Sequence, residues 1–140
     1  MAKPTYRDAA LMLQLAQNSA ALGLPKAANW LWSDEFIPDY AEFVKKYPWG
    51  SEGSLNATNM CGFYETVGTL YKHGLLNEDL LFDWLAISAV WDRIKGFALG
   101  VRQQAGNPRL YENFEAMANA DAAWAAKRAK LAAKPKGRKR

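Results

Sequence analysis

Apolar residues recur at alternating intervals of three and four, and this periodicity constrains the fold more than any other feature of the chain. Its clearest instance comprises Ile87, Val90, Trp91, Ile94, Phe97, Ala98 and Val101. This spacing places the side chains on one face of an α-helix. Nearly every other segment shows the same period, and none alternates convincingly with the period of two that is typical of a strand. The sequence therefore predicts an all-α fold.

Residues that favour helix ends divide this pattern into separate helices. Thr5 and Asp8 have the spacing of a capping box, and Asn77 is a favourable N-cap. Gly23 and Gly74 are typical of the left-handed residue that follows a helix. The resulting helical segments are 5–22, 27–32, 39–47, 54–73, 77–104 and the residues from about 108 onward, and a break near Ile87 is left open. We expect a single-domain bundle of five to six helices over residues 1–133.

The last predicted helix is long and rich in alanine. Asn107 suits its N-cap and Pro108 its first helical position, so the helix is expected to begin at about residue 108 and to end at about 133. Residues 134–140 read KPKGRKR, a composition that cannot build a core. They are predicted to form a disordered basic tail.

Charge is distributed unevenly along the chain. Residues 1–126 carry 10 Lys and Arg against 14 Asp and Glu, whereas residues 127–140 carry eight cations and no acid. These cations are Lys127, Arg128, Lys130, Lys134, Lys136, Arg138, Lys139 and Arg140. Such a segment could bind nucleic acid or another polyanion, and since no aromatic residue follows Trp124, we expect that binding to be independent of base sequence. The alternative is a solubilising end.

A second candidate surface consists of aromatic residues in irregular segments. They are Trp30, Trp32, Phe36, Tyr47 and Trp49. Trp and Tyr are favoured anchors of protein interfaces; the alternative is that these rings close the open end of the bundle. The first functional hypothesis is therefore a non-enzymatic helical interaction domain that binds a protein partner or itself. The polyanion-binding segment is the second.

The sequence offers no recognisable catalytic constellation. Cys61 is the one cysteine and His73 the one histidine, which leaves no intramolecular disulfide and no pair of metal-binding histidines. We therefore predict that the protein is not an enzyme and uses no metal or cofactor. The N-terminus does not resemble a signal peptide, and no apolar run is long enough to span a bilayer. The expected location is the cytoplasm.

Glu65 and Arg102 form a candidate polar pair within the fold. Each lies beside large apolar residues on a helix that should be mostly buried. A buried ion pair between them would favour one helix register over the alternatives. The other interpretation is that both side chains reach solvent separately.

Several elements of the sequence follow one another as they do in a known bacterial family. They are Phe63-Tyr64-Glu65 with Gly68, Leu75-Leu76-Asn77-Glu78-Asp79-Leu80, Trp91, Arg102, and Tyr111 to Phe114-Glu115. Over about residues 60–118 the chain resembles an uncharacterised family of small helical proteins, a domain of unknown function. The resemblance implies that Glu65, Trp91, Arg102, Phe114 and Glu115 belong to a shared all-α fold. It implies no activity, substrate or cofactor.

Overall fold

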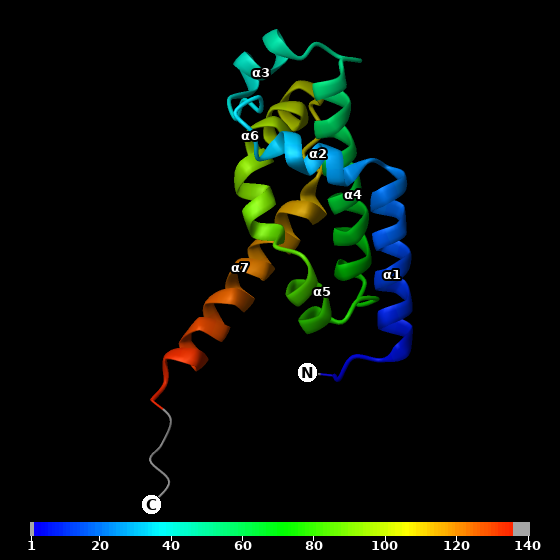
Figure 1. The fold of residues 1–140 in the computed structure, drawn as a ribbon. Helices are drawn as coiled ribbons and strands as arrows, with labels where there is room; N and C mark the ends of the chain where they lie inside the picture. Colours follow the sequence, from blue (N-terminus) through cyan, green and yellow to red (C-terminus); the bar gives the residue numbers. More distant parts are fainter. Residues whose placement is uncertain (1, 136–140) are drawn as a thin grey trace, which may run out of the picture.

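The structure, a computed structural model, describes residues 2–135, and within that range it contains helices and no strand (Figure 1). The helices are α1 (Tyr6–Ala21), α2 (Leu24–Leu31), α3 (Tyr40–Lys46), α4 (Glu52–Lys72), α5 (Glu78–Trp84), α6 (Ile87–Ala105) and α7 (Glu112–Ala133). The all-α class is confirmed. The described residues form seven helices rather than five to six, because the short segments are true helices and the segment predicted over 77–104 is split. The split falls at Leu85, whose backbone is extended.

The long helix α4 is the element around which the others are arranged. It packs against α7, α2 and α6, while α1 contacts α2 and α5, and α3 contacts α6. In Figure 1, α1 runs beside α4, α2 crosses near one end, and α7 runs obliquely away from the bundle. The core lies between α4, α6 and α7, and its fully buried side chains include Met60, Val67, Ile94, Phe114 and Met117.

Most of the predicted helix ends lie where the local signals place them. The Thr5–Asp8 capping box is present in full, and the Asn77 side chain accepts the Leu80 N–H at 3.0 Å. Gly74 is left-handed, and the N–H of Leu75 donates to the carbonyl of Leu70 at 3.0 Å, which completes a Schellman ending of α4.

The predicted start of the last helix is wrong. Asn107 forms a turn instead of a helix cap: its side chain accepts the Arg109 N–H at 3.0 Å, and its carbonyl accepts the Leu110 N–H at 3.2 Å. Tyr111 then adopts a left-handed conformation with a φ of 59°, and α7 begins at Glu112. The chain therefore changes direction once more before entering the helix.

A glycine lets this start approach α4 closely. A Cβ atom on Gly68 would lie 2.6 Å from the carbonyl oxygen of Asn113, a distance too short for any side chain. The opposing group is backbone in the first turn of α7, so it cannot rotate away. The contact between α4 and α7 therefore requires glycine at this position.

We expect Gly68→Ala to lower the free energy of unfolding by about 1–3 kcal/mol, because the added methyl group forces two helices apart. Gly62→Ala is the matched control on the same helix, since its Cβ would meet nothing within 4 Å. The control should raise stability by up to about 1 kcal/mol through helix propensity. Urea denaturation followed by circular dichroism measures both, and equal stabilities of the two variants would contradict the close-contact explanation.

Candidate functional site

The C-terminal part of α7 extends beyond the body of the domain (Figure 1). The last buried residue of the helix is Asp121, and Trp124 is half-buried, whereas every residue from 125 to 135 is exposed. Residues 125–133, which are helical and exposed, are called the arm below. Within the part of the chain that the structure describes, none of the arm's side chains is buried, and Arg128 lies over the ring of Trp124 at its root.

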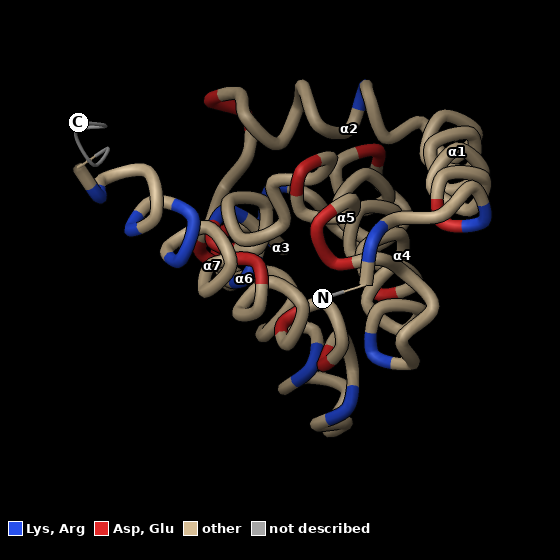
Figure 2. Tube along the Cα trace, turned by 90° about the horizontal axis from the view of Figure 1, so that it is seen from below, with Lys and Arg blue, Asp and Glu red and all other residues tan. Residues whose placement is uncertain are grey.

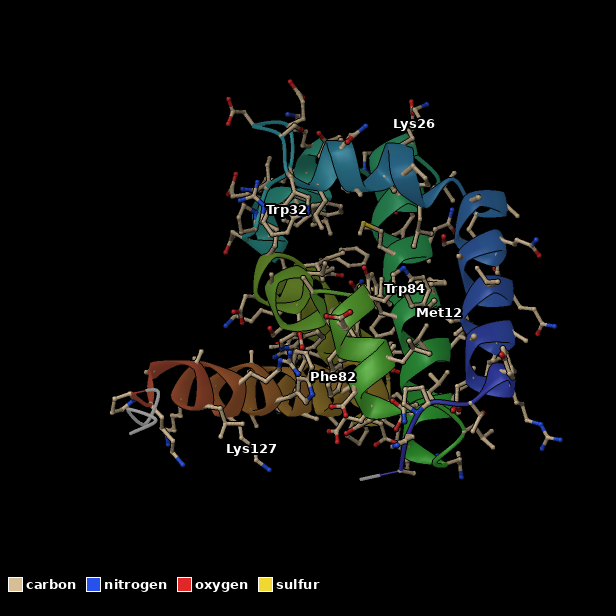
Figure 3. The ribbon with its side chains drawn as sticks, turned by 60° about the horizontal axis from the view of Figure 1, so that its bottom comes forward. Met12, Lys26, Trp32, Phe82, Trp84 and Lys127 are labelled. Atoms are coloured by element: carbon tan, nitrogen blue, oxygen red, sulfur yellow. The ribbon has the colours of Figure 1, made fainter. Side chains whose placement is uncertain are left out.

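The arm carries the described part of the predicted polyanion-binding segment. Lys127, Arg128 and Lys130 lie on it, and Lys134 is its C-cap residue. Figure 2 shows these cations gathered along the end of α7, while the acids of α5 lie on the body. In Figure 3 the side chain of Lys127 points away from the body. Lys136, Arg138, Lys139 and Arg140 lie outside the described residues.

Trp124 fixes the root of the arm to α5. Its indole N–H donates to the Asp79 carboxylate at 2.8 Å, and its ring packs edge-on against Phe82 at a centroid distance of 5.8 Å. The guanidinium of Arg128 lies over the same indole, 4.7 Å from the ring centroid. The arm therefore leaves the body from a defined point and in a defined direction.

The aromatic candidates separate into two groups. Trp30, Phe36 and Tyr47 pack with Phe43: the Trp30 ring lies 5.3 Å from that of Phe36 and 5.5 Å from that of Tyr47, and Phe36 is only 3% exposed. This cluster closes one end of the bundle. Trp32 and Trp49 are 55% and 61% exposed and remain available at the surface.

Glu65 caps α7 from the neighbouring helix. Its carboxylate accepts the N–H of Phe114 at 2.8 Å and that of Asn113 at 3.3 Å, two groups in the first turn of α7. Tyr111, the N-cap residue of α7, provides no capping side chain. A carboxylate at this position satisfies otherwise unpaired N–H groups and interacts favourably with the helix dipole.

Arg102 binds the same region from α6, with partners of its own. Its Nε–H donates to the carbonyl of Leu110 at 2.8 Å, and its Nη1 lies 3.0 Å from the Glu115 carboxylate. Glu65 and Arg102 thus both bind the start of α7. Their partners are groups of this segment, and they do not form the hypothesised ion pair with each other.

Asp121 caps the start of α6 from α7, a role that the sequence did not indicate. It is only 4% exposed, and its carboxylate accepts the N–H of Ser88 at 2.7 Å in the first turn of α6. The N-cap residue of α6 is Ala86, which cannot cap. A helix that begins without Ser, Thr, Asp or Asn is a signal that an acceptor must come from elsewhere.

Near the start of α7 the Nη2 of Arg102 is buried without a hydrogen-bond partner among the described residues. An open cleft of about 350 Å³ there is lined by Gly62, Glu65, Asn107, Arg109, Leu110, Tyr111, Glu112 and Asn113. Burial raises the pKa of Tyr64 and of Tyr111 to about 12, and burial also raises the pKa of the Cys61 thiol.

Among residues 2–135, no three His, Cys, Asp or Glu side chains are grouped to hold a metal, and no helix could span a membrane.

We expect Glu65→Ala to lower the free energy of unfolding by about 1–3 kcal/mol, because two N–H groups of α7 lose their acceptor. Glu52→Ala, which removes an exposed ion pair with Lys26, should cost at most about 1 kcal/mol. Double-mutant cycles should give a larger coupling for Arg102 with Glu115 than for Arg102 with Glu65. The reverse order would contradict the observed partners.

A comparison with family models identifies the chain. Residues 5–124 match the model described as "Domain of unknown function (DUF4760)". No curated protein and no solved structure matches the chain. The match covers helices α1 to α6 and the part of α7 up to Trp124, the last residue of that helix that is not fully exposed. The chain therefore belongs to this family of domains of unknown function.

Proposed function

We propose that the protein is a non-enzymatic helical interaction domain that binds a polyanion through the arm and the basic residues that follow it. The observation that carries this proposal is the exposure of the arm. A helical segment with Lys127, Arg128 and Lys130, followed by Lys134, extends away from the body, and no acid occurs after Asp121. Cations on a separate, acid-free element support binding to phosphate or sulfate groups.

The helical state of the arm favours this function. An isolated helix of fewer than about 12 residues is marginal in water because its first turn is costly to form. The arm avoids that cost since it continues from the packed part of α7, and its alanines have the highest helix propensity. Its cations are therefore held at set positions before a ligand arrives, which reduces the ordering entropy that binding must overcome.

The exposed pair Trp32 and Trp49 supports a second candidate, an interaction domain that binds a protein partner or a second copy of itself. Sedimentation velocity over a range of concentrations tests whether the chain binds a second copy of itself. Self-association through these rings should be lost in the Trp32→Ser, Trp49→Ser variant. A wild-type chain that stays monomeric would leave only a different protein as the partner.

We expect the variant Lys127→Gln, Lys130→Gln to elute from a heparin column at lower salt than the wild-type chain, because two fixed cations are lost from the arm. Lys3→Gln, Lys72→Gln is the matched control: it removes the same charge from exposed positions on the body and should elute close to the wild type. Equal shifts for the two variants would show retention by net charge and would contradict the proposal, as would a wild-type chain that is not retained at low salt.

A further inference from the structure

We infer that the polyanion is duplex nucleic acid, contacted on the phosphates of one strand by a stripe of three lysines. This inference rests on the proposed function and adds the partner and the face that meets it. The stripe consists of Lys127, Lys130 and Lys134, all exposed. Their intervals of three and four residues correspond to one side of a helix.

The dimensions of the stripe match a nucleic-acid backbone. Lys127 and Lys134 are seven residues apart, which at 1.5 Å per residue is about 10 Å along the helix axis. At 100° per residue the three lysines fall within an arc of about 60°. Phosphates of one strand follow each other every 3.4 Å along the duplex axis and farther apart along the strand itself, so a stripe of this length spans about two to three of them. Each lysine can therefore meet its own phosphate without bending the helix.

The opposite side of the arm determines how it can lie on a duplex. At 100° per residue that side carries Ala125, Ala129 and Ala132 together with Arg128, while Ala126 and Ala133 flank Lys130. A helix placed in the major groove has phosphates on both flanks and reads base edges with polar side chains. The arm has three lysines on one side, whereas the other side carries methyl groups and one cation, Arg128, whose guanidinium lies over Trp124. It is built to lie along one phosphate ridge, which makes the contact independent of base sequence.

The side chain of Arg128 does not belong to the lysine stripe. Its guanidinium lies over the Trp124 ring at 4.7 Å, and that ring is held in turn by Asp79. A cation over the face of an indole is attracted by the ring's electrons, so this contact holds the guanidinium against Trp124. We assign Arg128 to the root of the arm and exclude it from the phosphate-binding stripe.

Two other anionic partners fit less well. Single strands are bound on aromatic platforms, and residues 125–135 contain no aromatic side chain. Membrane-surface helices bury a continuous apolar face, and Leu131 is the one large apolar residue of the arm. Both partners enter the experiment as competing outcomes.

The experiment measures fluorescence anisotropy of a labelled 20-base-pair duplex against the full chain over a salt series. Lys127→Gln and Lys130→Gln should each reduce the slope of log affinity against log salt by about 0.9, the value for one phosphate contact. Arg128→Gln should leave the slope unchanged. The decisive variant moves one charge: Lys130→Ala with Ala132→Lys keeps the composition but places the lysine on the alanine side. It should lose the same 0.9, and circular dichroism confirms that its helix content is unaltered.

An unchanged slope for the relocated lysine would overturn the stripe, because net charge alone would then explain binding. So would a slope that falls as much for Arg128→Gln as for Lys130→Gln. Tighter binding to a single strand of equal length, or to phosphatidylglycerol vesicles, would overturn the duplex as partner while the polyanion function stands. Absence of any binding to all three probes and to heparin would instead refute the proposed function itself.

Discussion

Carboxylates that cap helices other than their own are the interactions on which the rest of this structure depends. Helices α6 and α7 begin at Ala86 and Tyr111, which provide no capping side chain. Their first N–H groups are satisfied by Asp121 of α7 and by Glu65 of α4. A buried N–H without an acceptor costs about 1–3 kcal/mol, so in the packed fold each of these helix starts is stabilised by a carboxylate of a neighbouring helix. Helix capping and helix packing are thereby coupled.

Several of the residues on which the resemblance to the family rests meet at the start of α7. Phe114 follows the capped turn of α7 and lies stacked on Tyr64 at 5.0 Å and edge-on to Trp91 at 4.9 Å. Glu65 accepts the N–H of Phe114 itself, and Arg102 donates to the carbonyl of Leu110 shortly before it. Residues from α4, α6 and α7 that are far apart in the sequence therefore meet at one turn and pack together there.

The features predictable from the sequence are those decided within a few residues. The Thr5 capping box, the Asn77 cap and the Gly74 ending depend on neighbours three to five positions away, and each is present. The start of α7 could not be predicted in this way, because its acceptor, Glu65, lies 48 residues before Asn113. The aromatic residues illustrate the same limit. Trp30 and Trp32 are two positions apart, and only the fold places Phe36, Phe43 and Tyr47 around Trp30 while it leaves Trp32 exposed. The sequence predicts that the arm is basic and rich in alanine. That it extends beyond the body depends on the other helices, which pack against α7 only as far as Trp124.

Because α7 is one uninterrupted helix of 22 residues, about 33 Å long, the arm and the capped first turn belong to the same rigid rod. Between them Phe114, Met117, Ala118 and Asp121 are buried against the rest of the domain, and the Trp124 indole is hydrogen-bonded to Asp79. The direction of the arm is therefore set along the whole packed length of α7 and not at its root alone. Reorienting the arm relative to the body would require these buried side chains to repack.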